Sequence, residues 1–494
     1  MTPSAIPVNP ARQQEVLAAL QAVLPPGCIL HTQEDTRPYE CDGLAAYRQL
    51  PMLVVLPHDE QQVIAAVKVC HTLQCPIVPR GAGTGLSGGA QPLADGVVLS
   101  TARLNRIVRI DEDGGTAVVQ PGVRNLAISE AVAQLGLYYA PDPSSQIACT
   151  MGGNVAENAG GVHCLKYGLT LHNVMRVRLV LADGAVVEVG SAALDCSGLD
   201  LLTLVIGSEG MLGIVTEVQV KLVPKPLAAR VIMASFRDVE SGGNAVASVI
   251  AAGIIPAGLE MMDQTSSRMV EPFVKAGYDL DAAAILLCES DGTVEEVEEE
   301  IARMLAVLEQ AGASKLAVSQ SDAERLRFWS GRKNAFPAAG RISADYYCMD
   351  GTIPRKRLAE VLLGIAAMEK KYGLRCANVF HAGDGNLHPL ILFDANIPGE
   401  FDRAESFGFE ILELCVAVGG TITGEHGVGI EKITAMCVQF APAELEAFFA
   451  VKRAFDPAMI LNPNKAIPTL QRCAEAGKMH IKGGRLPFAD LPRF

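Results

Sequence analysis

Residues 79–90 read PRGAGTGLSGGA and contain five glycines. Residues 83–88 match the G-x-G-x-x-G pattern, which at first suggests a Rossmann-type dinucleotide site. In a Rossmann fold the glycine loop leads directly into a helix, whose N-terminus carries the pyrophosphate. Here Gly89 and Pro92 follow, and then the strand-like residues 94–100, so no helix can begin at this point. The loop therefore connects two strands, which disfavours a soluble NAD-dependent dehydrogenase.

Glycine-rich segments of this kind suit a phosphate ligand. Consecutive unblocked N–H groups at a concave turn form a nest for anions, and the hydroxyls of Thr84 and Ser87 add donors. A tight surface turn would not need so many glycines. Two further clusters, TMGGNVAENAGG at 150–161 and GSEGMLGIVTEV at 207–218, lie in the same stretch of chain. Three such loops predict one extended dinucleotide.

Composition narrows the class of protein. The chain has 494 residues and a net charge of −14, with both signs interspersed, which argues against nucleic-acid binding. Its 13 cysteines include no C-x-x-C pair, so we expect neither an iron–sulfur cluster nor a disulfide framework. The N-terminus lacks the features of a signal peptide, and the most apolar window, residues 245–259, is too short to span a membrane.

The periodicity predicts two folding regions. Short β-rich runs alternate with helical patterns at 59–73 and 124–136, which is typical of an α/β domain up to about residue 223. Pro224 and Pro226 mark a boundary. Strand, helix, strand and amphipathic helix then follow between residues 229 and 312, which predicts a second α+β domain. The acidic run 295–300 is interpreted as a solvated helix face.

A pair of histidines points to a metal site. In NVFHAGDGNLHPLILF, residues 378–393, strand-like runs flank Asp384-Gly385, the preferred pair for a two-residue hairpin turn. That turn would place His381 directly opposite His388, with Cβ atoms about 4.5–5.5 Å apart. Two imidazoles so placed form half of a divalent-metal site, although they could also simply pack across a hairpin.

A second polar pair would complete such a site. The glycine-rich stretch GGTITGEHGVG, residues 419–429, presents Glu425 and His426 side by side. The carboxylate could be the third protein ligand, leaving positions open for a substrate, while the neighbouring imidazole acts as a base.

Four segments together resemble the FAD-binding segments of the vanillyl-alcohol-oxidase type of FAD-linked oxidases: PRGAGTGLSGG, PDPSSQIACTMGGNVAENAGG, GSEGMLGIVTEV and FDPAMILNPNK. The resemblance covers nearly the whole chain and is greatest to the FAD-linked subunits of bacterial glycolate oxidases, relatives of D-lactate and D-2-hydroxyglutarate dehydrogenases. It implies an α+β fold class. A PCMH-type FAD-binding domain of two α/β subdomains would span residues 1–226, a cap domain 227–420, and a C-terminal segment 421–494 would complete the active site and the FAD site.

The resemblance also implies cofactor contacts. FAD would be bound non-covalently, because the glycine loop lacks the histidine to which some relatives attach it. The residues that would contact FAD are Arg80, Gly81, Ala82, Gly83, Thr84, Gly85, Gly88, Gly89, Pro141, Thr150, Gly152, Gly153, Asn154, Asn158, Ala159, Gly160, Glu209, Gly213, Ile214 and Asn462.

Catalytic roles follow from the same resemblance. His381, His388 and Glu425 would bind zinc, manganese or iron, and His426 would be the general base in the oxidation of a small 2-hydroxy acid. Arg332 would hold the substrate carboxylate in the bidentate geometry that arginine favours. The hydroxyglutarate enzymes place a lysine near the position of Cys348, and its absence favours a monocarboxylate such as glycolate or D-lactate.

The expected partners are a second FAD-linked subunit and an iron–sulfur subunit of a glycolate oxidase complex. We therefore expect a cytoplasmic protein that is peripheral to the inner membrane through these subunits. Two alternatives stay open: a stand-alone D-lactate or other D-2-hydroxyacid dehydrogenase, and a non-catalytic flavin-binding assembly subunit.

Overall fold

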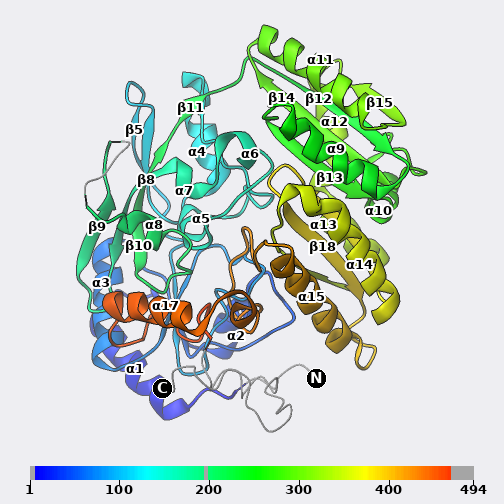
Figure 1. Cartoon of the computed structure of the whole chain (residues 1–494). Coiled ribbons are helices and arrows are strands. Elements are labelled where there is room, and N and C mark those ends of the chain that lie inside the picture. Colours follow the sequence, from blue (N-terminus) through cyan, green and yellow to red (C-terminus); the bar gives the residue numbers. More distant parts are fainter. Residues whose placement is uncertain (1–5, 194–197, 469–494) are drawn as a thin grey trace. The chain divides into compact units, whose positions relative to one another are not determined.

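The computed structural model of the chain describes residues 6–193 and 198–468. Contacts divide these residues into two units. The large unit consists of residues 6–159, 169–224 and 425–468, and the small unit of residues 160–168 and 225–424. Figure 1 labels their helices and strands. The chain thus leaves the large unit twice and returns to it each time.

The large unit is built on two sheets. The first has the strand order β1-β2-β4-β3, with β2, β4 and β3 parallel and buried, as their continuous apolar runs predict. The second is antiparallel, in the order β5-β6-β10-β8-β9. The bounds are β1 Ile29–Leu30, β2 Leu53–Val55, β3 Ile77–Arg80, β4 Val97–Ser100, β5 Ile107–Asp111, β6 Thr116–Val119, β8 Val174–Val180, β9 Val186–Gly190 and β10 Ile214–Lys221; β7 (Leu137–Tyr138) pairs with β11 (Val223–Pro224).

Helices pack against these sheets. The side chain of Asp59 caps α3 by accepting from the backbone N–H of Gln62. The cluster at 150–161, which the sequence analysis interprets as a loop, contains the short helix α5. The α-helices of the large unit are α1 Pro10–Gln21, α2 Gln33–Thr36, α3 Glu60–Thr72, α4 Asn125–Val132, α5 Met151–Glu157, α7 Thr170–Asn173, α8 Leu201–Val205, α16 Met436–Gln439 and α17 Pro442–Phe455.

The small unit contains an antiparallel sheet in the order β15-β12-β14-β13-β17-β18-β16. Alternation along β14 shows the two sides of this sheet: Leu287 joins a core with Trp329, whereas Ala284 faces Gly242. Helices α10, α12 and α13 cover the first face, and α9, α11, α14 and α15 lie together on the other. The strands are β12 Ala228–Phe236, β13 Gly258–Asp263, β14 Ala284–Gly292, β15 Lys315–Val318, β16 Asp345–Cys348, β17 Arg375–His381 and β18 Asn386–Phe393.

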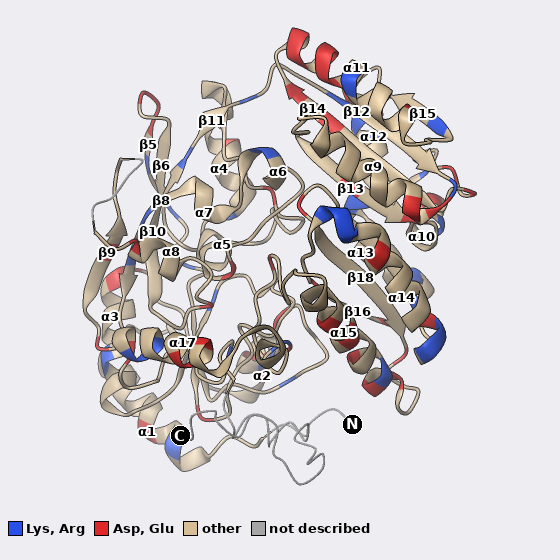
Figure 2. Ribbon diagram, in the orientation of Figure 1, with Lys and Arg blue, Asp and Glu red and all other residues tan. Residues whose placement is uncertain are grey.

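The α-helices of the small unit are α6 Cys164–Tyr167, α9 Val239–Ala251, α10 Gln264–Val274, α11 Val294–Gln310, α12 Asp322–Lys333, α13 Ala335–Ile342, α14 Leu358–Tyr372 and α15 Glu400–Ala417. The acidic run 295–300 lies on α11, where Val297 and Ile301 face the core and the intervening glutamates are mostly exposed (Figure 2). This confirms the solvated helix face.

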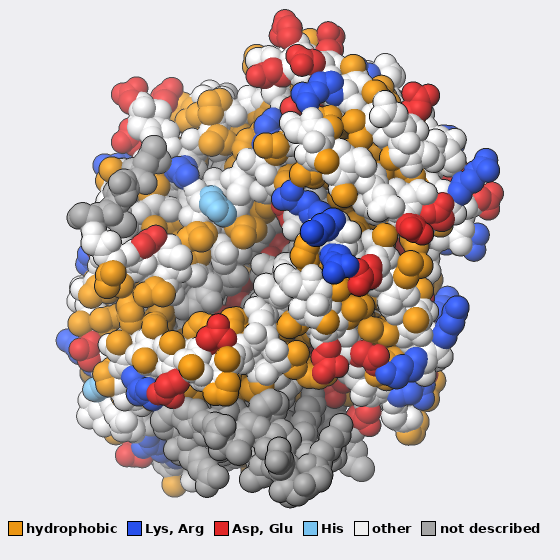
Figure 3. Space-filling view, viewed as in Figure 1, with side chains coloured by type: hydrophobic (Ala, Val, Ile, Leu, Met, Phe, Trp, Pro, Cys, Tyr) orange, Lys and Arg blue, Asp and Glu red, His pale blue; other side chains and the backbone are white. Residues whose placement is uncertain are grey.

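The surface agrees with the composition. On the face drawn in Figure 3, charged side chains of both signs are interspersed with apolar and neutral ones. No helix among the described residues is both long and apolar enough to cross a bilayer.

Candidate active site and cofactor cradle

The glycine loop of the large unit connects β3 to β4 without an intervening helix, as predicted. Gly83 and Gly88 adopt φ angles of +71° and +76°, which side chains rarely allow. The backbone N–H groups of residues 82–89 donate to no acceptor within the described parts of the chain. Residues 87–89 are buried, and buried N–H groups nearly always have partners, so these donors fit a ligand rich in acceptor oxygens, such as the diphosphate of FAD.

The loop lies against the start of α5. A Cβ atom on Gly81 would come within 2.5 Å of the Thr150 hydroxyl. The hydroxyls of Thr150 and Ser87 are buried and have no hydrogen-bond partner among residues 6–193 and 198–468. The glycine loop and the start of α5 therefore pack closely and present hydrogen-bond donors that the described residues do not use. These residues fit the predicted FAD cofactor.

The C-terminal segment ties this cradle together. Asn462 Nδ2 donates to the carbonyl oxygens of Gly89 (2.9 Å) and Glu209 (2.6 Å). Lys465, which the sequence did not single out, donates through Nζ to the carbonyl of Gln91 at 2.9 Å. Asn462 is 1% exposed, so these hydrogen bonds are buried. Asn462 thus supports the loops that we expect to hold FAD.

Glu209 has a similar supporting role. Its carboxylate accepts from the backbone N–H groups of Val428 (2.6 Å) and Gly429 (2.8 Å). Burial raises the pKa of this carboxyl, against the effect of the two N–H donors. Glu209 therefore fixes the turn that directly follows Glu425 and His426.

The other residues that were predicted to contact FAD are placed as follows. Arg80 donates to the carbonyl of Cys41 at 2.7 Å, and burial lowers the pKa of its guanidinium. Asn158 ends α5 in the left-handed conformation and accepts from Leu171 N–H. Gly152, Gly153 and Asn154 lie within α5, Ala159 follows its C-cap, and the carbonyl of Pro141 accepts from Asn125 Nδ2. Gly213 precedes the buried Ile214 at the start of β10, and Gly160 opens the segment 160–168 of the small unit.

The two predicted histidines lie on one face of the small unit's sheet. The predicted register was wrong: His381 pairs with Asn386 and Val379 with His388, so a four-residue loop, 382–385, replaces the two-residue turn. Because Val379 and His381 share a face, His388 is diagonal to His381 rather than opposite it. The imidazole ring centroids are 5.0 Å apart, and both residues are 2% exposed. His381 and His388 are therefore close to each other, as predicted, but in a different strand register.

Two buried carboxylates adjoin the histidines, and the sequence analysis had named neither. Glu260 Oε1 accepts from His381 Nδ1 at 2.7 Å, and Oε2 accepts from Arg332 Nε at 2.5 Å. Asp350 Oδ1 lies 3.5 Å from His388 Nε2, while its Oδ2 accepts from Thr423 Oγ1 and from the backbone N–H of Gly424. The signal for Glu260 was a charged residue inside the apolar run AGLEMM, residues 257–262.

These side chains supply enough donors for a metal ion. Within the small unit, the ring centroids of His381 and His388 are 5.0 Å apart, and the carboxylate of Asp350 lies 3.5 Å from His388 Nε2. Imidazoles with carboxylates are the donor set that zinc, manganese and iron accept. The residues present therefore fit a divalent metal.

Comparison with known proteins agrees with these features. A family model described as "FAD binding domain" matches residues 51–190, and one described as "FAD linked oxidases, C-terminal domain" matches residues 225–466. The Escherichia coli K12 protein named glycolate oxidase subunit GlcD is 62% identical, over 97% of this chain and 96% of its own. A Bacillus subtilis protein of the same name is 40% identical over 86% of this chain and 91% of its own.

Two less similar proteins also match the chain. A D-lactate dehydrogenase of Anaerostipes hadrus is 32% identical over 89% of this chain and 94% of its own. Among solved structures, p-cresol methylhydroxylase superposes with a TM-score of 0.80 and 18% identity, covering 95% of this chain and 99% of its own. At that identity the match speaks for the fold, and it confirms the predicted PCMH-type α+β architecture. The chain therefore belongs to the FAD-linked oxidases, and it is an FAD-linked oxidoreductase of the glycolate oxidase subunit group.

Proposed function

We propose that this chain oxidises glycolate to glyoxylate, and D-lactate to pyruvate as a second substrate, with non-covalently bound FAD as hydride acceptor. The relative named glycolate oxidase subunit, at 62% identity, supports glycolate as the first substrate. The relative named D-lactate dehydrogenase, at 32% identity, supports D-lactate as the second. The observation that carries the proposal is the pair of buried imidazoles, His381 and His388, whose ring centroids lie 5.0 Å apart beside the carboxylate of Asp350. With Glu425 as a third ligand, these side chains would supply the two-histidine, one-carboxylate set of a catalytic metal site.

The residues divide the chemistry between them. His381, His388 and Glu425 would hold zinc, manganese or iron, which lowers the pKa of a bound hydroxyl group. His426 would take the hydroxyl proton, a role for which imidazole is suited near neutral pH.

Arg332 would bind the substrate carboxylate. Its Nε is held by Glu260, and its Nη1 donates to no acceptor among the described residues. Nη2 contacts the ring of His381, so Nη1 is the nitrogen that could donate a hydrogen bond to a substrate carboxylate. Residues 346–354 contain no lysine, which supports a monocarboxylate over a dicarboxylate.

The electrons would leave through partner subunits. The E. coli and B. subtilis relatives are named as subunits, and the potential metal-ligand groups of the described residues contain no cysteine for an iron–sulfur cluster. We infer a second FAD-linked subunit and an iron–sulfur subunit as partners. They would hold this cytoplasmic chain at the inner membrane.

Steady-state kinetics with an artificial dye acceptor test the substrate. We expect kcat/KM to be highest for glycolate, lower for D-lactate and lowest for D-2-hydroxyglutarate, and removal of metal by a chelator to abolish turnover while FAD stays bound. Preference for D-lactate would favour the stand-alone dehydrogenase. Unchanged turnover after chelation would contradict the metal site.

A further inference from the structure

Glu260 lies where it can orient one of the proposed metal ligands. Strands β13 and β17 are antiparallel, with Met261 opposite Phe380, so the next pair in this register sets Glu260 opposite His381. Residues opposite each other share a sheet face and have adjacent Cβ atoms. Glu260 is 1% exposed, which is rare for a glutamate unless it is paired.

The contacts of Glu260 determine the tautomer of His381. A carboxylate accepts hydrogen bonds, so the imidazole nitrogen 2.7 Å from Glu260 Oε1, Nδ1, carries the proton. The lone pair of the neutral ring is then on Nε2. Arg332 Nη2 lies 3.3 Å from Nε2 and 3.5 Å from Nδ1, nearly equidistant, and therefore away from the lone-pair direction of Nε2.

We propose that Glu260 is a positioning residue that holds His381 with Nε2 directed to the metal site. This inference rests on the proposed metal ligation by His381. Arg332 Nε, 2.5 Å from Oε2, gives the buried carboxylate of Glu260 a cationic partner. A carboxylate bonded to the far nitrogen of a ligating histidine fixes its orientation and makes it a better ligand.

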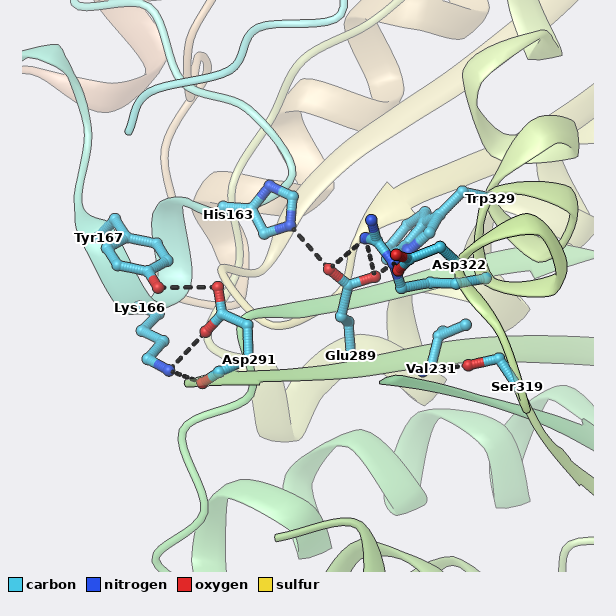
Figure 4. Close-up of polar contacts among 10 residues, drawn as sticks. His163, Lys166, Tyr167, Val231, Glu289, Asp291, Ser319, Asp322 and Trp329 are labelled. Atoms are coloured by element: carbon cyan, nitrogen blue, oxygen red, sulfur yellow. Dashed lines mark hydrogen bonds and ion pairs between the residues drawn. The ribbon is translucent and has the colours of Figure 1, made fainter. Parts of the chain in front are cut away.

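The same sheet offers a matched control. Glu289, on β14, is 2% exposed and accepts from Arg325 Nη1 at 3.1 and 3.2 Å. It also accepts from His163 Nε2 (3.3 Å) and Trp329 Nε1, as Figure 4 shows. Burial by itself would raise the pKa of Glu289, but His163 and Arg325 outweigh it and lower the pKa. Glu289 thus resembles Glu260 in burial and in having arginine and histidine partners, and its described contacts include neither His381 nor His388.

Metal binding tests the inference directly. Wild type, Glu260→Gln, Glu260→Asp, Glu289→Gln and His381→Ala would be titrated with Mn²⁺ alone by equilibrium dialysis, and their Co²⁺ absorption spectra compared. We expect Glu260→Gln to weaken Mn²⁺ binding by about 10–100-fold and to alter the cobalt spectrum. Glu289→Gln should bind as wild type does, although both glutamine variants lose thermal stability. Glu260→Asp, which keeps the carboxylate, should bind more tightly than Glu260→Gln.

The outcomes separate this inference from the function on which it rests. Wild-type affinity in Glu260→Gln, or equal losses in Glu260→Gln and Glu289→Gln, would overturn the role of Glu260 alone. Equal Mn²⁺ binding by wild type and His381→Ala would overturn the metal site and this inference with it. Should Glu260→Gln fail to fold, Glu260→Asp is compared with His381→Ala, and Mn²⁺ binding no tighter in Glu260→Asp than in His381→Ala would overturn it.

Discussion

Two glycines of the glycine loop, Gly88 and Gly85, differ in whether the fold itself requires glycine at their positions. A Cβ on Gly88 would come within 2.5 Å of Ile430, and the residue has a positive φ, so the protein itself requires glycine there. A Cβ on Gly85 would meet only the carboxylate of Asp42, at 4.0 Å, and its φ is not in the left-handed region. Nothing in the described parts of the chain requires glycine at position 85, which suits the close approach of a ligand to the backbone.

Gly85→Val and Gly88→Ala should therefore differ. We expect Gly85→Val to lose FAD on gel filtration while the thermal midpoint of the apoprotein stays near that of wild type. Gly88→Ala should lower that midpoint, since it combines backbone strain with a clash. Full FAD retention in Gly85→Val would mean that the diphosphate lies elsewhere.

Residue-level reasoning from sequence found the polar side chains better than their pairing. It identified His381 and His388 because imidazoles flanking a glycine turn are conspicuous. It did not identify Glu260, whose partners are 72 and 121 residues away in the chain. Such a contact depends on strand order, which no local pattern specifies.

At the scale of secondary-structure elements, the packing of the hairpin formed by β17 and β18 explains why its predicted register was wrong. Asp-Gly favours a two-residue turn in isolation. In the folded chain a Cβ on Gly385 would come within 2.2 Å of the Ile353 carbonyl, and one on Gly383 within 2.6 Å of Leu165. The loop between β17 and β18 is thus shaped by close packing against other segments, and tertiary contacts override local turn preference.

At the same scale, one ion pair links α3 to β8 in the large unit. Glu60 accepts from Arg178 Nε (2.7 Å) and Nη2 (2.9 Å), and also from Thr216 Oγ1 on β10. Arg178 first, and then Thr216, hold the pKa of this carboxyl below its usual value of 4.5. A carboxyl whose pKa is lower in the folded state stabilises the fold at pH values above its usual pKa. This stabilisation is lost as the pH falls through the lowered pKa.

Glu60→Gln should therefore lower the thermal midpoint at pH 7, and the difference from wild type should shrink as the pH falls below about 4.5. Melting curves between pH 3 and pH 7 measure this, with the exposed Glu112→Gln as control. A difference that stays constant over this range would contradict the assignment.

At the scale of the whole molecule, the chain order explains the site. The segment after residue 424 carries Glu425 and His426 directly into the turn that Glu209 holds, and then reaches Asn462 and Lys465, which bind the glycine-loop region. Family resemblance predicted that the C-terminal segment completes the site. The hydrogen bonds that secure it were not predictable, because each joins a side chain to a backbone group far away in the sequence.

The central claim is that His426 removes a proton from a substrate held beside the flavin. Anaerobic stopped-flow mixing with glycolate, monitored by loss of flavin absorbance, isolates that half-reaction from any electron acceptor. We expect rapid bleaching in wild type and in the exposed control His31→Ala, and a rate about 10²–10⁴-fold lower in His426→Ala with FAD content unchanged. Bleaching of His426→Ala at the wild-type rate would contradict the account.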